Sequence, residues 1–527
     1  MKHAHKFFLL LLAACATSTG AMAQIGYSDA LMYSQTQFGG TARFQGFAGA
    51  GSSLGGDLSS ASINPAGLGF NRRSEFSLSA ALGVNTYETG YLGNTTRENR
   101  LNVNLPSFGV VFSRPKNGLS GNYGGSFAIS VNRLQNFQGA VAYEGVNNQN
   151  QITDFFLQQA DGIPWDDFEQ QGIGGQLDLL GLAYYTYQIN PDIIEDPGTR
   201  DSYFSIMPLP SQFPTTQRQS ITTSGAQYQW DFSYGGNYDD TFYYGFGIGV
   251  QTLRYSRERE YTESINQQNN VFNELVLVDF LEQNGVGINL KGGVIYRAAD
   301  RLRLGVSAVS PTWYRVTEAY SEEMFVDYNN FEFFTGIDEQ GNEQFTVLNN
   351  EAAEAFYENI TFSMRTPWRL NVGASYFFNK NGFISADVEY VDYTTAQLNN
   401  PRIELDGADA GFDFDFDNEV IGQEAASAVN IRVGGEYRVR DFRFRAGYAQ
   451  YGDPFETDDV SGTVRRFVTA GAGMRKKDFY VDLALVNGLS DRTYKPYVLF
   501  DGNRDVSPRA DASVNNFRMV LSFGSFF

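Results

Sequence analysis

Apolar and polar residues alternate along most of the chain, from Glu75 to the last residue. Between Glu75 and Val84 every even position is apolar, and the odd positions hold glutamate, serine, alanine or glycine. The same pattern runs from Phe242 to Gln251, where glycine or glutamine fills the odd positions from 245 onward. Because successive side chains of a strand point to opposite faces of a sheet, this alternation predicts strands with one apolar face and one small or polar face.

The alternation recurs in about 14 segments, and bacterial membrane barrels have an even number of strands with apolar side chains toward lipid and polar ones toward the lumen. The predicted fold is therefore all-β, a closed antiparallel transmembrane β-barrel of about 14 strands. The predicted strands cover 75–86, 101–113, 122–137, 222–238, 241–257, 285–298, 301–316, 366–378, 382–394, 428–439, 442–451, 465–476, 478–488 and 513–527.

The connections between these segments alternate between short and long. Short turns such as Asp239-Asp240 are typical of the periplasmic side of a barrel, and long polar loops are typical of the extracellular side. The acidic run from Asp406 to Asp417 is expected to be a solvated loop, although its carboxylates also suit calcium. The main predicted extracellular loops are 138–221, 258–284, 317–365 and 395–427.

Residues 1–23 predict export through a signal peptide. Lys2 and Lys6 precede an apolar run, and Ala21-Met22-Ala23 forms a small-residue cleavage signal before Gln24. Leu12-Ala13-Ala14-Cys15 also matches a lipoprotein cleavage box that would leave Cys15 lipidated, but a closed barrel needs no lipid anchor. No later segment approaches the roughly 18 apolar residues of a membrane helix. The predicted location is the outer membrane, and the lipid bilayer is the first expected partner.

Several kinds of chemistry are excluded by composition. His3, His5 and Cys15, the only histidines and cysteine, lie in the leader, so the mature chain would lack imidazole and thiol groups for nucleophile pairs, zinc or haem. A formal charge of −21 disfavours nucleic acid as a partner. Aromatic residues make up 15% of the chain, which suits the interfacial girdles of a barrel. We expect no enzyme activity, no cofactor and no metal site; an outer-membrane hydrolase would lack a histidine base.

Residues 24–73 differ from the rest of the chain. They show no sustained alternation and are rich in glycine, alanine and serine. A barrel of about eight strands is filled by its own side chains, whereas one of about 14 leaves a lumen that leaks unless something occupies it. We therefore predict that 24–73 fold into the lumen as a hatch and that 74–527 form the barrel with its loops.

The segment from Asp57 to Leu68 contains the motif Asn64-Pro65-Ala66-Gly67 just before the first predicted strand. In this the chain resembles the FadL/TodX family of outer-membrane transport proteins, whose hatch carries an Asn-Pro-Ala motif at the same place. Further matches occur at 366–376, 386–393 and 445–448, where that family places later strands. The loop at 138–221 looks long for the family. Physically, Asn64-Pro65 favours a turn and Gly67 permits unusual backbone angles, so the motif can seat the hatch against the wall.

Two sets of residues are candidates for the interior of the barrel. Apolar residues of the hatch would contact the wall or a ligand: Phe44, Phe47, Leu54 and Ile63. Charged residues on neighbouring predicted strands would point inward as a mixed-charge ladder, either as a polar wall for a solute or, as we prefer, as pairs that hold strands and hatch together. The ladder comprises Asp387, Glu389, Arg432, Glu436, Arg443 and Arg445.

A third candidate lies in the loop at 138–221. Its apolar residues have the spacing of a short amphipathic helix, and the family resemblance implies that extracellular loops form an apolar groove for the ligand. Packing of a loop helix on its own barrel would explain the residues equally well. The candidates are Phe155, Phe156, Trp165 and Phe168.

The resemblance implies passive, hatch-gated uptake of small hydrophobic compounds such as long-chain fatty acids or aromatics. The alternative is a barrel of the same fold that binds another envelope protein in a secretion or surface-assembly complex. In either case the last strand ends on Phe527, the residue type that ends many outer-membrane barrels, so the barrel assembly machinery is an expected partner during biogenesis.

Overall fold

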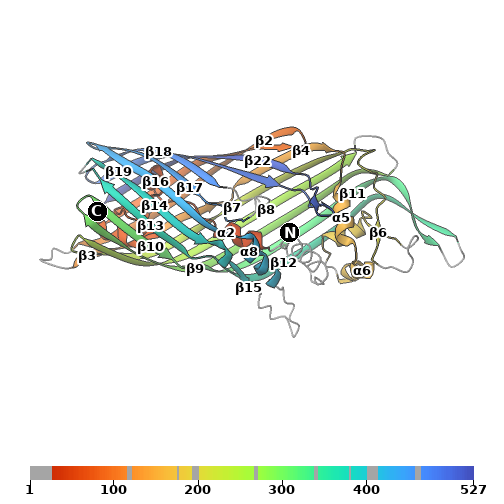
Figure 1. Cartoon of the computed structure of the whole chain (residues 1–527), viewed down its shortest axis with the longest axis horizontal. Helices are drawn as coiled ribbons and strands as arrows, with labels where there is room; N and C mark the ends of the chain where they lie inside the picture. Colours follow the sequence, from red (N-terminus) through yellow and green to blue (C-terminus); the bar gives the residue numbers. More distant parts are fainter. Residues whose placement is uncertain are drawn as a thin grey trace, which may run out of the picture.

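The chain forms a closed antiparallel barrel, seen from the side in Figure 1. The computed structural model describes residues 26–115, 122–174, 177–192, 201–265, 271–337, 342–378, 381–399, 414–456 and 464–527. Strand β1 (Glu75–Tyr91) pairs with the last strand, β22 (Ala510–Phe526), over its whole length, from Glu75 opposite Phe526 to Tyr91 opposite Ala510. This pairing closes the sheet, so the wall has no free edge at the junction of its two ends.

The wall has 14 strands among the described residues, as the sequence predicts. Four of them are interrupted, so that β3 continues into β4, β10 into β11, β12 into β13 and β14 into β15. The strands between β1 and β22 are β2 (Asn94–Pro115), β3 (Asn122–Asn136), β4 (Gly139–Asn147), β7 (Thr215–Tyr238), β8 (Phe242–Ile265), β9 (Phe272–Ala299), β10 (Leu302–Val309), β11 (Trp313–Ile337), β12 (Glu343–Arg365), β13 (Arg369–Phe377), β14 (Gly382–Asp392), β15 (Gln397–Asn399), β16 (Ser427–Val439), β17 (Phe442–Tyr451), β18 (Arg465–Arg475) and β19 (Phe479–Tyr494).

Two of the interruptions lie side by side at prolines. Pro311 separates β10 from β11, and Pro367 separates β12 from β13. Proline has no N–H to donate to a ladder, so a regular strand stops there. Two hydrogen bonds connect the chain segments at these breaks. The Thr366 N–H donates to the Thr312 carbonyl at 3.1 Å, and the Thr312 N–H donates to the Thr366 hydroxyl at 2.8 Å.

The apolar face of the wall changes sides along the barrel. Near the end with short turns, Phe246 and Ile248 of β8 are exposed on the outside while Gln251 is buried inside. Farther along the same strand Leu253 and Tyr255 are buried inside, and the positions between and around them on the outside become polar. The first region is a lipid-facing band, whereas the second has the polar exterior and apolar interior of a soluble protein.

Two of the predicted loops are wrong because of this change of face. Segments 258–284 and 317–365 are mostly strand, because β8 extends to Ile265, β9 begins at Phe272, and β11 and β12 fill nearly all of 313–365. The sequence prediction assumed that the apolar residues of a strand face lipid. It therefore ended these strands where the apolar side chains begin to face the inside of the barrel. The hairpin of β11 and β12 reaches beyond the other strands at the right of Figure 1.

The other two long connections contain short elements. Segment 138–221 contributes β4 and part of β7, and between them lie α5 (Ile152–Ala160), α6 (Trp165–Gly174), α7 (Leu179–Tyr185), β5 (Asn190–Pro191) and β6 (Tyr203–Phe204). Segment 395–427 contains β15 and α8 (Asp415–Glu424), which follow the short helix η2 (Tyr393–Thr395). A two-stranded piece, β20 (Phe500–Asp501) and β21 (Arg504–Asp505), lies before β22.

None of the helices in the described ranges is long and apolar enough to cross a bilayer. The predicted signal peptide at 1–23, with Cys15, and most of the acidic run from Asp406 to Asp417 lie outside the described residues.

The N-terminal segment 26–73, called the hatch below, lies inside the barrel. It consists of α2 (Tyr27–Ser34), α3 (Ala42–Gly46), α4 (Ser60–Ile63) and the 3-10 helix η1 (Pro65–Phe70), joined by tight turns. Most of its small and apolar residues are buried, including Ala42, Ala61 and Ala66 at 0% exposure. Small residues suit this position because the hatch must fit within a fixed wall.

Candidate site between the hatch and the barrel wall

The Asn64–Gly67 motif attaches the hatch to the wall. The Asn64 side-chain amide donates to the Ser52 carbonyl at 2.7 Å, and its Oδ1 accepts from the Ala66 N–H at 3.1 Å. The same amide nitrogen lies 3.3 Å from the Val294 carbonyl and 3.4 Å from the Val306 carbonyl, on β9 and β10. Asn64 therefore fixes the start of η1, holds the preceding loop and faces two wall strands.

The wall facing this motif is made of glycine. A Cβ atom at Gly245 would lie 2.3 Å from the Ala66 nitrogen, and one at Gly293 would lie 2.3 Å from the Asn64 Oδ1. Both distances are far below contact distance, so only glycine lets the two backbones approach this closely. Gly245 of β8 and Gly293 of β9 thus make room for the motif at the wall.

The side chains of the predicted charge ladder point into the barrel. They form separate ion pairs and not one continuous network. Asp387, Glu389, Arg432, Glu436 and Arg445 are buried, and Arg443 is half-buried. Arg432 lies 3.7 Å from Glu389, and Arg445 lies 2.9 Å from Glu436 and 2.6 Å from Asp482 on β19. This arrangement fits the interpretation that the charges hold strands together in pairs.

The ladder also holds the hatch. The Asp387 carboxylate accepts a hydrogen bond from the Ser52 N–H at 2.8 Å. Glu436 lies 3.3 Å from Arg43 of α3, whose guanidinium also lies 3.4 Å from Asp57 of the hatch. Two ladder carboxylates are therefore attachment points for the hatch at different places on the wall. Arg518 of β22 also contacts the hatch, because its guanidinium donates to the Phe38 carbonyl at 3.2 Å.

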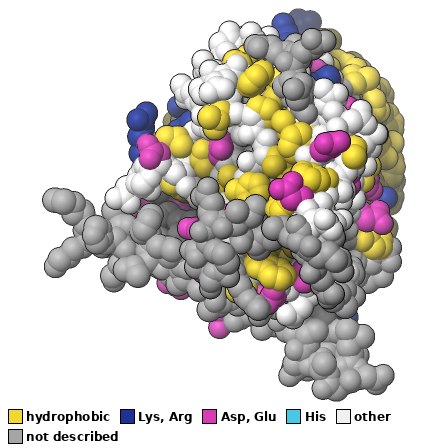
Figure 2. All heavy atoms as spheres, turned by 90° about the vertical axis from the view of Figure 1, so that its right-hand side faces the viewer, with side chains coloured by type: hydrophobic (Ala, Val, Ile, Leu, Met, Phe, Trp, Pro, Cys, Tyr) yellow, Lys and Arg dark blue, Asp and Glu magenta, His cyan; other side chains and the backbone are white. Residues whose placement is uncertain are grey.

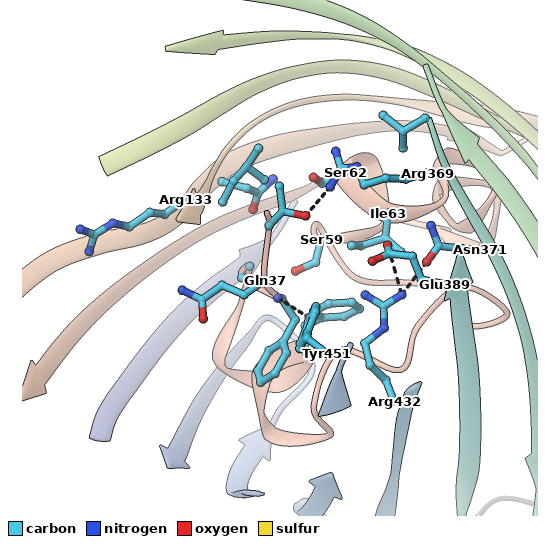
Figure 3. Close-up of a pocket in the computed structure, with 18 residues that line it drawn as sticks. Gln37, Ser59, Ser62, Ile63, Arg133, Arg369, Asn371, Glu389, Arg432 and Tyr451 are labelled. Carbon is cyan, nitrogen blue, oxygen red and sulfur yellow. Dashed lines mark hydrogen bonds and ion pairs between the residues drawn. The ribbon is translucent and has the colours of Figure 1, made fainter. Parts of the chain in front are cut away.

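A pocket opens between the hatch and the wall, and Figure 3 shows the residues around it. On the hatch side lie Gln37, Phe38, Phe44, Ser59 and Ile63, and the wall contributes apolar and charged side chains. Tyr451 borders the pocket and accepts a hydrogen bond at its hydroxyl from the Phe38 N–H at 2.8 Å. The wall residues of the pocket include Asn132, Arg133, Leu134, Val309, Arg369, Asn371, Glu389 and Arg432.

The four predicted hatch contacts fall into two groups. Phe44 and Ile63 line the pocket. Phe47 and Leu54 belong to a hydrophobic cluster with Phe383 of β14, whose ring centroid lies 5.6 Å from that of Phe47. Phe44 joins the groups, because its ring lies 5.4 Å from the Phe47 ring. Ile63 and Phe44 are thus the members of the set that a ligand in this pocket would touch.

Comparison with solved structures identifies the fold. A FadL homologue from Pseudomonas aeruginosa matches 93% of this chain and 98% of its own, with a TM-score of 0.50 and 12% sequence identity. The fold is that of the FadL/TodX barrels. The toluene transporter TodX of P. putida and TbuX of Ralstonia pickettii also align over 93% of the chain, at 12% identity and TM-scores of 0.47 and 0.45. No family model and no curated protein matches the sequence.

In this FadL-like barrel the inward side chains at the end with the long connections are apolar. Inward side chains from β8, β9 and β11, among them Leu253, Leu277 and Met324, form one hydrophobic cluster with α2 of the hatch and with the helices of segment 138–221. The cluster replaces the polar lining found nearer the other end. These side chains are buried against one another, against α2 and against the loop helices.

Phe155, Phe156 and Phe168, three of the four residues predicted to form a loop groove, belong to or pack against this cluster. Phe156 of α5 is fully buried and Phe168 of α6 is 1% exposed, while Phe155 packs against the cluster and Trp165 is half-buried. The loop helices thus pack onto the barrel, which is one of the two interpretations of their spacing. Burial of a phenylalanine contributes about 1.5–3 kcal/mol, so these side chains stabilise the loop.

Several pocket residues were not predicted from the sequence. Arg369 and Asn371 follow the break at Pro367, and Tyr451 ends β17. The alternation places Asn371 and Tyr451 on the same face of the sheet as the ladder. Both could therefore have been predicted to point into the barrel. Arg133 and Asn132 come from β3, far from the ladder in the sequence, and nothing in the sequence pattern brings the two walls together.

A buried polar cluster joins α2 to the part of the wall at the end with the long connections. The Gln283 amide of β9 donates to Asp29 at 2.9 Å and to Glu318 of β11 at 2.6 Å, and the Tyr33 hydroxyl donates to the Gln283 side-chain oxygen. Burial raises the pKa of Asp29 to about 6, and burial together with the charge of Asp29 raises the pKa of Glu318 to about 8. The folded protein therefore shifts both carboxyls toward the protonated form.

We expect the attachment of α2 to weaken as pH rises. A raised carboxyl pKa contributes stability that is complete below the unfolded value near 4 and is lost as pH increases through about 6 for Asp29 and about 8 for Glu318. Hydrogen exchange at α2 amides, corrected for intrinsic rates, should show roughly tenfold or more greater protection at pH 5 than at pH 8.5. The double variant D29N/E318Q should remove most of that difference; an unchanged difference would assign it to other groups.

Proposed function

We propose that the protein is an outer-membrane channel for the passive uptake of small hydrophobic compounds, opened by movement of the hatch. The observation that carries the proposal is the cluster of inward-facing apolar side chains at the end of the barrel with the long connections, which packs against the loop helices and against α2 of the hatch. The fold shared with a FadL homologue and the resemblance of the Asn64–Gly67 motif to that family support the same conclusion.

The apolar side chains define the proposed path. A solute captured among the loop helices would enter the cluster around Leu253 and Leu277 and then reach the pocket at Leu134, Val309 and Ile63. In the pocket the solute would contact these apolar side chains beside charged ones such as Arg369 and Arg432, and its own concentration gradient would drive the movement. The hatch contacts then govern release, because the residues below the pocket belong to the hatch.

A variant that fills the pocket tests the path. Replacement of Ile63 by tryptophan should reduce uptake of a hydrophobic solute by roughly tenfold, because a large ring in a close-packed site excludes other molecules. Uptake of a radiolabelled fatty acid or of toluene into cells that express the variant gives the measurement. Native mass spectrometry of the purified barrel, with extraction of any bound molecule, gives an independent one.

The matched control is V347W, at an exposed position on the β11–β12 hairpin far from the pocket. It should transport and bind as the wild-type protein does. Equal uptake by I63W and wild type, with both folded, would contradict the proposed path.

One feature favours a second function, binding to another envelope protein. On the β11–β12 hairpin Phe345, Val347 and Phe356 are 53%, 56% and 58% exposed, and Figure 2 shows hydrophobic and acidic side chains together on the described part of this end. Exposed apolar groups beyond a membrane barrel suit a protein contact. Purification of the barrel empty and in fixed stoichiometry with a second protein, lost on replacement of Phe345 and Phe356 by serine, would favour this function over transport.

A further inference from the structure

A second cavity lies under the hatch, at the end of the barrel with the short turns. Its wall comes from β1, β16, β17, β18 and β19, and its roof is formed by α3 and the turn at Gly56 and Asp57. In membrane barrels the short turns face the periplasm, so this cavity lies where a solute would leave. It is separate from the pocket around Ile63, since the two share no lining residue.

The cavity concentrates positive charge in an acidic protein. Five arginines and four carboxylates line it, although the whole chain carries a formal charge of −21. The arginines are Arg43, Arg438, Arg443, Arg445 and Arg475, and the carboxylates are Asp57, Glu75, Glu436 and Asp482.

Three of the arginines are committed to Glu436. Arg445 lies 2.9 Å, Arg438 2.8 Å and Arg43 3.3 Å from its carboxylate oxygens. Asp482 is bound to Arg445, and Asp57 to Arg43. Glu75 accepts a hydrogen bond from the Tyr480 hydroxyl at 2.7 Å. The carboxylates of the cavity are thus already engaged.

Arg443 and Arg475 differ from the other three. Within the described ranges, no carboxylate lies within 4.0 Å of the nitrogens of either side chain. Arg443 donates to the carbonyls of Arg440 and Phe442 at 3.2 and 3.3 Å, and Arg475 lies over the Phe526 ring at 4.6 Å. Each guanidinium has five donors, so both retain donors for a further acceptor.

We propose that this cavity binds a carboxylate through Arg443 and Arg475. Guanidinium groups match the planar, two-oxygen geometry of a carboxylate, and a cavity that holds unpaired positive charge favours an anion over a neutral molecule. The carboxylate is either the headgroup of an amphiphilic solute that leaves the hatch or a small soluble acid from the periplasm. The first source rests on the proposed transport function, whereas the second does not.

The site also borders a contact that holds the hatch. Arg43 bridges Asp57 of the hatch and Glu436 of the wall, and it lines the same cavity. A carboxylate bound here would compete with Glu436 and Asp57 for the Arg43 guanidinium. Binding of the anion would therefore loosen this contact of the hatch.

The test is calorimetric binding to the full-length barrel in a nonionic detergent, with dodecanoate, dodecanol and butyrate as probes. In the double variant R443Q/R475Q, dodecanoate or butyrate should bind roughly tenfold or more weakly, as expected for the loss of hydrogen bonds to a charged group. Dodecanol should bind the variant and the wild type equally. The control is R440Q, which removes an exposed arginine at the neighbouring turn and should leave all three affinities unchanged.

The outcomes separate the two sources and the two proposals. If R443Q/R475Q loses affinity for dodecanoate alone, the carboxylate bound at the site is the headgroup of an amphiphile. If the variant loses affinity for butyrate to the same extent, the ligand is a small soluble acid. Butyrate binding that needs both arginines, with no binding of either long-chain probe, would support the site and contradict the transport proposal. Equal affinities of wild type and R443Q/R475Q for both carboxylates, with the variant folded, would overturn the site.

Discussion

Replacement of Gly245 by leucine should release the hatch from the wall and open the barrel to ions. A Cβ atom at this position would lie 2.3 Å from Pro65 and Ala66, and the rest of the leucine side chain has no room beyond it. The wall strand β8 is held on both sides by long ladders with β7 and β9, whereas η1 is a single short helix. We therefore expect the hatch to move and the wall to persist.

The measurement is single-channel current in a planar bilayer. An unplugged barrel of 14 strands is wide enough to hold water, so conductance should rise by roughly tenfold or more over the wild-type baseline. Gly292 of β9 gives the matched control, since a Cβ there would meet only the Gly245 carbonyl, at 3.7 Å. The variant G292A should stay closed. A closed G245L barrel would show that Asn64–Gly67 does not seat the hatch.

Replacement of Glu436 by glutamine should cause a large loss of stability. Its carboxylate faces three guanidinium groups, from Arg43, Arg438 and Arg445, and its side chain is 1% exposed. Removal of this charge takes from Arg438 the carboxylate with which it pairs and leaves Arg43 and Arg445 with one each, Asp57 and Asp482. Breaking a buried ion pair in this way costs about 3–5 kcal/mol. The adjoining cavity admits water, so we expect a value near 3 kcal/mol.

Urea unfolding in detergent micelles gives the free energy of unfolding for this comparison. The variant E98Q serves as the control, because Glu98 is an exposed carboxylate on β2 and its loss should change stability by less than about 0.5 kcal/mol. A similar, small change for both variants would mean that the arginines find other partners when Glu436 is neutral.

The strands of the wall could be predicted because lipid imposes one rule on them. Phe76, Leu78 and Leu82 of β1 are exposed as the alternation requires, and the same rule applied to all 14 strands. Prediction failed where lipid ends. On β9 the inward residues Leu275 and Leu277 are buried, so the apolar positions are one residue out of phase with Val286 and Ile288 on the lipid side.

The site was less predictable than the fold. The direction of the ladder follows from the alternation, but its partners Arg43, Ser52 and Asp482 lie on segments far away in the sequence. The motif at Asn64 indicated a turn, while the glycines that receive it, Gly245 and Gly293, are recognisable only when both surfaces are placed together. Pairing between distant surfaces is a property of packing, and local patterns do not encode it.

The change of face along β8 means that apolar residues are required on the outer face of one part of the strand and on the inner face of the next part. A serine in place of Ile248 would put a polar group into lipid, and a serine in place of Leu253, five residues later, would put one into a dry interior from the other side. Between the two positions lies the level of the bilayer surface. The amino-acid sequence of a single strand thus records the height at which the membrane ends.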